Sequence, residues 1–164
     1  MKTVNLIRHA KSSWEDSRLS DVNRPLAPRG IKDCKIMAGH ILEAGWNPVN
    51  VFCSRAQRAQ LTIRGIAKAL PYRDINWLID DALYTFSYGS LINWLEQLDD
   101  EISEVTLVGH NPAFTDLVNH LSKARLDNVP TCAYVQMVSS AHMWEELSSS
   151  QTEMVHFVKP KMFK

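Results

Sequence analysis

Short apolar segments rich in β-branched residues alternate with helical patterns along this chain. Residues 3–7, 49–53 and 104–108 read as three such strands, and each is followed by polar or glycine-containing sequence. Between them, apolar residues recur at spacings of three and four, which is typical of amphipathic helices. Parallel strands need long crossovers, usually helical, so this alternation predicts an α/β fold with helices on both faces of the sheet.

The helical patterns can be placed along the chain. Gly45 offers a C-terminal stop for the first and Pro71 closes the second. The four stripes cover residues 31–42, 56–70, 91–98 and 114–121. Two further strands, at 131–138 and 153–158, flank a polar connection and are expected to extend or edge the sheet. We therefore expect a three-layer α/β/α sandwich with a mostly parallel central sheet.

The length of 164 residues suits one domain with a buried core. No internal repeat, low-complexity segment or interior linker divides the chain, so we expect a single domain over residues 1–164. No stretch approaches the 18 to 20 apolar residues of a membrane span, and the first residues lack the pattern of a signal peptide. A cytoplasmic protein that does not bind membranes is the simplest expectation.

The charged residues and the cysteines exclude several classes of function. The 18 Lys and Arg residues balance 18 Asp and Glu residues, so no global field attracts nucleic acid or an anionic membrane. Cys34, Cys53 and Cys132 are odd in number and widely separated, which argues against both a disulfide framework and a zinc site. Any attraction for anions must be local.

The residues that follow the three expected strands carry the chemistry. Ligands of an open parallel sheet bind beyond the carboxyl ends of its strands, so these residues are expected to meet at one edge. The residues concerned are Arg8, His9, Lys11 and Ser12 after the first strand, Ser54, Arg55 and Arg58 after the second, and His110 and Asn111 after the third. Each group alone is common in surface turns and helix starts; their joint appearance favours a site.

This set of side chains suits a phosphoryl group. Guanidinium groups such as those of Arg8 and Arg58 match phosphate oxygens and stay charged at any working pH. A neutral imidazole facing the phosphorus can attack it, while the arginines and a second histidine stabilise the transition state. Backbone N–H groups after Ser54 could add to the same field. A dinuclear metal site is disfavoured, because the partners of the histidines are mainly arginines rather than carboxylates.

Three segments, "LIRHAKSSW", "CSRAQRAQLT" and "VTLVGHNP", resemble the signatures of the histidine phosphatase superfamily, whose fold is phosphoglycerate-mutase-like. Within it the chain is similar to the small SixA-type phosphohistidine phosphatases. The resemblance covers essentially the whole chain and includes "NRPLAPRG", which contains Arg24. Arg55 stands where the family usually has proline, which adds a positive charge near the expected pocket.

The resemblance implies roles for individual residues. His9 would be the nucleophile that accepts the phosphoryl group, and Arg8, Arg58 and His110 would bind phosphate. It implies an α/β/α fold, a phosphohistidine intermediate and no metal or cofactor. We also expect His9 Nδ1–H to donate to a backbone carbonyl, leaving Nε2 as the attacking atom. Lys11, Ser12, Arg24, Ser54, Arg55 and Asn111 are the accessory candidates.

The substrate is inferred from what the chain lacks. Larger members of the superfamily supply a carboxylic acid from an inserted segment, whereas residues 71–91 are too short here for more than a minimal cap. Cleavage of a P–O bond benefits strongly from such an acid, while a protonated imidazole leaves a P–N bond more easily. The expected substrate is therefore phosphohistidine on a protein, such as a signalling or phosphotransfer protein.

Several alternatives stay open. Asp16 or Asp21 could serve as the acid, although loop carboxylates are more often solvated turn residues. Phosphomonoester hydrolysis or mutase activity on a small metabolite, and phosphate binding without turnover, are the competing functions. Four aromatic residues could line the approach to the pocket or belong to the core or surface: Trp14, Tyr84, Phe86 and Tyr88.

Overall fold

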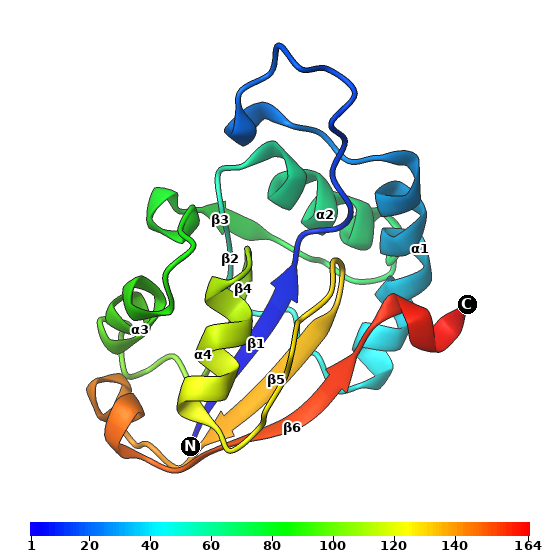
Figure 1. Ribbon diagram of the computed structural model, residues 1–164. Coiled ribbons are helices and arrows are strands. Elements are labelled where there is room, and N and C mark those ends of the chain that lie inside the picture. Colours follow the sequence, from blue (N-terminus) through cyan, green and yellow to red (C-terminus); the bar gives the residue numbers. More distant parts are fainter.

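The computed structural model describes residues 1–164 and is built on a six-stranded sheet with the order β3-β2-β4-β1-β5-β6 (Figure 1). Four strands run parallel: β1 (Lys2–Arg8), β2 (Val51–Cys53), β3 (Trp77–Ile79) and β4 (Glu104–Gly109). Two antiparallel strands, β5 (Tyr134–Ser139) and β6 (Thr152–Val158), complete the sheet on the other side of β1. The mostly parallel sheet predicted from the sequence is confirmed.

Helices cover both faces of this sheet (Figure 1). The helices α1 (Pro28–Glu43) and α2 (Gln57–Lys68) pack on one face, and α3 (Tyr88–Glu96) and α4 (Ala113–Leu121) pack on the other. Alternate side chains of a strand point to opposite faces, so Leu6 joins the core beneath α3 and α4 while Ile7 joins the core beneath α1 and α2. The α/β/α sandwich is confirmed.

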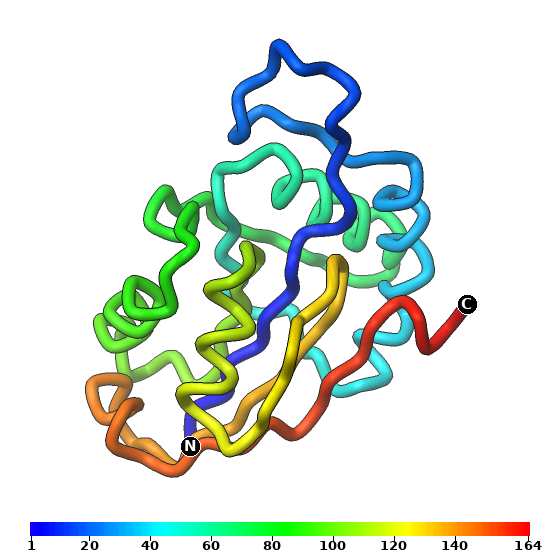
Figure 2. The backbone as a smooth tube through the Cα atoms, viewed as in Figure 1, coloured from blue at the N-terminus to red at the C-terminus, as the bar shows by residue number.

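The register of the parallel strands aligns their carboxyl ends. Arg8 pairs with Gly109, and Cys53 pairs with Val108, so β1, β2 and β4 end within one residue of each other. The residue after each strand therefore emerges at the same edge of the sheet. This edge also carries the long connection between β1 and α1, which projects beyond the sheet (Figure 2, blue).

Helix α1 follows local rules at both ends. Pro28 occupies its first turn, where a missing N–H costs nothing because the first N–H groups of a helix have no partner within it. The helix ends before Gly45, whose φ of 100° is a left-handed conformation that glycine adopts without steric strain. The stop predicted at Gly45 is therefore present. None of the helices has the length and apolar character needed to cross a bilayer.

Two features differ from the sequence-based expectation. The interpretation of residues 71–91 included no strand, yet Trp77–Ile79 forms β3 at the edge of the sheet. This strand has only three residues and all of them are apolar, so its sequence lacks the alternation typical of a strand. Its central residue, Leu78, is exposed. The polar 139–152 connection contains a buried anchor, Trp144, whose indole N–H donates to the Ile102 carbonyl at 2.8 Å.

Candidate active site

His9 follows β1 directly and is held on both its backbone and its ring. Its backbone N–H donates to the Gly109 carbonyl at 3.0 Å, which extends the pairing of β1 with β4. The side chain is only 7% exposed, and Nδ1 lies 2.7 Å from the Ala10 carbonyl oxygen. Because a carbonyl oxygen only accepts, Nδ1 carries the proton and Nε2 keeps its lone pair. The contact expected from the sequence is present.

The peptide after His9 is tied to α2 through Thr62. The Ala10 N–H donates to Thr62 Oγ1 at 2.8 Å, and this hydroxyl donates to the Arg58 carbonyl at 2.6 Å. Both bonds are buried, where a well-aligned hydrogen bond also fixes geometry. Thr62 thus couples the carbonyl that orients His9 to the helical turn that carries Arg58.

His110 follows β4 and lies beside His9. Their ring centroids are 5.3 Å apart, and His110 is 1% exposed. Nε2 of His110 shares a hydrogen bond of 2.8 Å with Ser54 Oγ, the residue that follows β2. The rings of Tyr84 and Phe86 pack against the imidazole of His110 with centroid distances of 5.5 and 5.4 Å. All three strand ends therefore contribute to one site.

Arg8 and Arg58 bring positive charge to these histidines. Arg58 is the second residue of α2 and is 3% exposed. Arg8 Nη1 donates to the Val129 carbonyl at 2.8 Å, whereas its buried Nε has no hydrogen-bond partner in the protein. Buried donors without partners are rare, and those of Arg8 and Arg24 occur together at this site. Such donors suit an anionic ligand with several oxygens.

Burial and the neighbouring cations keep both histidines neutral. Burial lowers the pKa of His9 to about 3, opposed by its bond to Ala10 and reinforced by Arg58, Arg8 and Arg24. Burial, followed by the charges of His9 and Arg58, lowers the pKa of His110 to about 3 as well. A neutral His9 is the form that can act as a nucleophile. A bound anion would favour the protonated form of His110.

Asp21 occupies part of the cationic site. The Arg58 guanidinium donates to the Asp21 backbone carbonyl at 2.7 Å and to its carboxylate at 3.0 Å, and the Tyr84 hydroxyl donates to the same carboxylate at 2.5 Å. Burial favours a higher pKa for Asp21, but the bonds from Tyr84 and Arg58 and the charges of Arg58 and Arg24 outweigh it and lower the pKa. In this arrangement Asp21 is an anion bound to Arg58 rather than a proton donor.

The other accessory candidates lie around this centre. Arg24 is buried, donates to Ser12 Oγ, and has its guanidinium carbon 3.4 Å from the centroid of the Trp14 ring. Arg55 lies over the Tyr84 ring at 5.1 Å. The side chain of Lys11 is exposed, while its backbone carbonyl accepts a hydrogen bond from the N–H of Ala27.

Three further candidates, Asn111, Asp16 and Tyr88, contact residues other than the two histidines of the site. Asn111 donates to the Val129 carbonyl at 2.9 Å and accepts from the Thr115 hydroxyl at 3.0 Å, so its amide ties α4 to the loop before β5. Asp16 pairs with the exposed Arg18. The Tyr88 ring packs beside His120, in α4.

A gap in the sequence reasoning concerns Asp21 and its partner. The contact between Asp21 and Arg58 spans 37 positions, and no spacing rule for helices or strands links them. The position of Asp21 in the loop after His9 made it a candidate acid, but nothing in the sequence indicates that Arg58 is its partner. The involvement of Tyr84 likewise depends on how the connection after β3 folds over His110.

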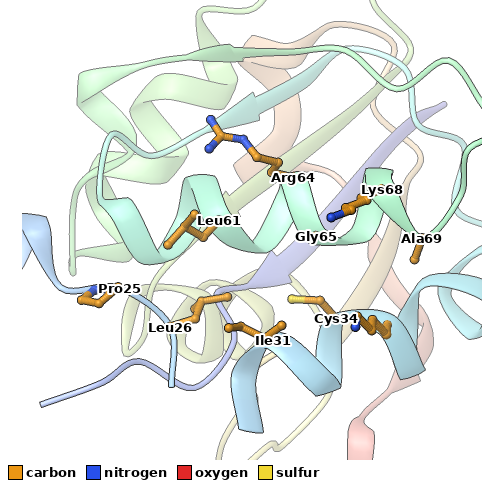
Figure 3. Close-up of a pocket in the computed structure, with 10 residues that line it drawn as sticks. Pro25, Leu26, Ile31, Cys34, Leu61, Arg64, Gly65, Lys68 and Ala69 are labelled. Carbon is orange, nitrogen blue, oxygen red and sulfur yellow. The ribbon is translucent and has the colours of Figure 1, made fainter. Parts of the chain in front are cut away.

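The structure contains no group of three or more His, Cys, Asp or Glu side chains placed to bind a metal ion. A cavity of about 690 Å³ lies away from the two histidines, between α1 and α2 (Figure 3). Apolar residues such as Leu26 and Leu61 line it, together with the cations Lys35, Arg64 and Lys68. The site is thus defined by its side chains rather than by this cavity.

Comparison with known proteins now assigns the class. The sequence model of the histidine phosphatase superfamily (branch 1) matches residues 4–106, which include the first and second predicted motifs. The chain belongs to this superfamily, and its class of enzyme is phosphatase. An uncharacterised chloroplastic protein of Arabidopsis thaliana is 28% identical over 149 residues, covering 86% of this chain and 68% of that protein. An uncharacterised protein of Mycobacterium tuberculosis is 35% identical over 112 residues, covering 68% and 66%.

Solved structures confirm the phosphoglycerate-mutase-like fold. The protein histidine phosphatase SixA complexed with tungstate superposes with a TM-score of 0.79 at 20% identity, covering 99% of both chains. A SixA structure from Agrobacterium tumefaciens gives 0.78 at 22% identity, covering 97% of this chain and 99% of that one. A mycobacterial glucosyl-3-phosphoglycerate phosphatase gives 0.66 at 12% identity, with 94% and 97% covered. The fold is therefore shared by phosphatases named for different substrates.

Proposed function

We propose that this protein removes the phosphoryl group from phosphohistidine on a protein, through a phosphohistidine intermediate at its own His9. The hydrogen bond from His9 Nδ1 to the Ala10 carbonyl carries the proposal, because it leaves the Nε2 lone pair free to attack. The proposal includes a single phosphatase domain over residues 1–164 with a minimal cap and no metal or cofactor.

Two transfers complete the reaction. In the first, His9 Nε2 forms a bond to phosphorus as the bond between phosphorus and the substrate imidazole breaks, and the leaving nitrogen acquires a proton. In the second, a water oxygen attacks phospho-His9, which releases phosphate and restores the imidazole. Arg8, Arg58 and a protonated His110 would stabilise the equatorial oxygens in both transfers.

The state of Asp21 supports a phosphoramidate over an ester. A protonated carboxyl near the leaving group would favour an alkoxide-like leaving oxygen, but Asp21 is ionised and bound to Arg58 and Tyr84. The leaving imidazole of a phosphohistidine needs less help from an acid. The shared fold with SixA agrees with this choice, although the fold also hosts a sugar-phosphate phosphatase.

The His9→Ala variant tests the nucleophile. Incubation of the wild type with a ³²P-labelled phosphohistidine peptide should give a label on the protein that is stable to alkali and labile to acid. His9→Ala should give no label and lose about a thousandfold or more in turnover. His120→Ala, which changes a histidine of α4 outside the site, is the matched control and should label normally. Full activity of His9→Ala would end the proposal.

A phosphomonoesterase or mutase remains the second candidate, because Asp21 lies within the site and could gain a proton when phosphate competes for Arg58. Rates on a phosphohistidine peptide and on a simple phosphate ester separate the two. A clear preference for the ester would overturn the substrate assigned here. Phosphate binding without turnover of either substrate would instead indicate a binding module.

A further inference from the structure

A second concave surface lies between the start of α1, the loop before β5 and the C-terminal turn, and most of the residues that line it are polar or charged. We call it the basic groove; its volume is about 520 Å³, and two prolines are the only apolar residues that line it. The lining residues are Arg29, Asp33, Pro130, Thr131, Lys159, Pro160, Lys161 and Lys164. Four of the eight are cations, in a protein whose positive and negative charges cancel overall.

Most of this positive charge is not neutralised within the fold. The one carboxylate of the groove, Asp33, is buried and pairs with Lys164 at 2.8 Å. Arg29, Lys159 and Lys161 form no ion pair with any carboxylate of the protein. Like charges placed together repel one another, so such a cluster is favourable mainly when an anion faces it.

The groove adjoins the catalytic residues through the loop before β5. Pro130 and Thr131 lie between Val129, whose carbonyl accepts from Arg8, and Cys132, whose N–H lies 3.1 Å from the His9 carbonyl. The tip of this loop lies beside the end of β1, next to the C-terminal turn of the chain (Figure 1).

The other side of the groove approaches the same loop. Arg29 precedes Gly30, which packs so closely on the connection after His9 that an added Cβ would lie 2.2 Å from the Lys11 carbonyl oxygen. Only glycine fits at this contact, so the start of α1 is held against the residues that follow His9. Two segments thus connect the basic groove to the residues of the candidate active site: the loop before β5 and the connection that follows His9.

We propose that the basic groove binds Asp and Glu side chains that flank the phosphohistidine of a protein substrate. This inference rests on the proposed function and names the substrate class more narrowly: acidic phosphoproteins. Charges at the rim of an interface act mainly on partner choice and on the association rate, and association steered by charge gains roughly 10-fold to 1000-fold. The groove would therefore select the substrate without taking part in the chemistry.

A protein partner fits the lining better than a nucleic acid does. Single-stranded nucleic acids bind through aromatic platforms on which bases stack, and the groove has none. Carboxylates need only cations and polar groups, which the groove supplies. An oligonucleotide that competes for the groove would therefore contradict a protein partner.

The test compares two triple charge reversals in the full chain. The first, R29E/K159E/K161E, alters the basic groove. The matched control, K35E/R64E/K68E, changes the same number of charges around the cavity between α1 and α2 (Figure 3). The substrates are two phosphohistidine peptides of equal length, one flanked by Asp and Glu and the other by Ser and Gly. Circular dichroism checks that both variants fold; a milder K159Q/K161Q variant should shift in the same direction.

The wild type and the control variant should prefer the acidic peptide by about 10-fold to 100-fold in kcat/KM at low salt, through KM rather than kcat. This preference should vanish in R29E/K159E/K161E and should weaken in the wild type at about 0.5 M salt. Equal preferences in all three proteins, or loss in the control as well, would overturn the proposal. Displacement of the acidic peptide by an oligonucleotide of the same net charge would also overturn the proposal.

Binding of an unphosphorylated acidic peptide, followed by fluorescence anisotropy, separates this inference from the proposed function. If the wild type turns over neither peptide, the proposed phosphatase activity fails. Even then, anisotropy that drops only for R29E/K159E/K161E would support the groove, while equal binding by all variants would reject it.

Discussion

The two sides of the candidate active site are built differently. The floor, defined as His9, Ser54, Arg58 and His110, has no side chain more than 7% exposed. The wall, defined as Trp14, Asp21, Arg24 and Tyr84, contains exposed side chains, with Trp14 at 70%. The floor residues follow directly from strand ends and a helix start, while the wall residues lie on connections.

Different kinds of contact hold the floor and the wall in place. Backbone pairing places the floor, since Arg8 and Gly109 are partners in adjacent strands. Side-chain contacts and local turn hydrogen bonds hold the wall, such as Arg24 on Trp14, Tyr84 on Asp21, and the Arg24 N–H on the Asp21 carbonyl. Chemistry that needs accurate positioning is best carried by rigid elements, whereas loops can adapt to a substrate. We therefore propose that the floor carries catalysis and that the wall adjusts anion binding.

Arg58→Ala should have the largest effect of the predictions on this comparison. It removes a buried guanidinium from the phosphate site, and kcat/KM for a phosphohistidine peptide should fall by about 100-fold to 1000-fold. Arg55→Ala removes an exposed arginine three residues earlier and should change the rate by less than about threefold. A loss below tenfold for Arg58→Ala would mean that the floor does not carry the phosphate chemistry.

The floor should also control stability at acid pH. His9 and His110 have pKa values near 3 in the fold and about 6.5 when unfolded, so the unfolded chain binds more protons between these values. The free energy of unfolding should therefore decrease as pH falls from about 6.5, by up to roughly 1.4 kcal/mol per pH unit for each histidine. Urea denaturation at several pH values measures this slope.

The His110→Gln variant and the titration of Asp21 provide the controls for this dependence of stability on pH. His110→Gln should remove about one of the two protons involved, so its slope should be roughly half that of the wild type. The lowered pKa of Asp21 acts in a separate window, because its contribution is present above about pH 4 and is lost below it. A flat profile between pH 6.5 and 4 would show that the histidines are not held neutral.

Asp21→Asn should have a smaller effect than Arg58→Ala, and it should strengthen the binding of phosphate where Arg58→Ala weakens it. Replacing the carboxylate by an amide weakens its bond to Arg58 Nη2 and removes one negative charge, so tungstate or phosphate should bind roughly threefold to tenfold more tightly by calorimetry. Asp16→Asn, on the same connection, should leave the affinity unchanged. A hundredfold loss of ester turnover in Asp21→Asn would instead identify Asp21 as a general acid.

Tyr84→Phe should have the smallest effect. It removes the hydroxyl that donates to Asp21 and keeps the ring that packs on His110, so we expect a change of about twofold in phosphate affinity. Steady-state kinetics and anion binding measure it. An effect as large as that of Arg58→Ala would erase the distinction between floor and wall.

The sequence predicted the floor because backbone rules determine it. His9, Ser54 and His110 follow strands that their apolar composition identifies, and parallel strands end at one edge. The helical stripes and the stop at Gly45 were equally local signals. The fold could therefore be predicted from features that lie within single strands and helices.

The wall and the edges of the fold could not be predicted in the same way. The contact of Asp21 with Arg58 joins distant parts of the chain, and its side chains have no periodic pattern. The accessory role predicted for Asn111 stays a prediction, and the sequence could not show that its amide binds Val129 and Thr115. The strand Trp77–Ile79 is stabilised by pairing with β2 rather than by its own composition.

The position of β1 within the sheet bears on how this protein loses activity on heating. Because β1 has β4 on one side and β5 on the other, its amides should exchange with solvent only when the whole sheet opens. The middle of the connection that follows it, residues 14–23, is mostly exposed and pairs with no strand. Heat inactivation should then coincide with global melting, while proteases should cut the connection first in the folded protein.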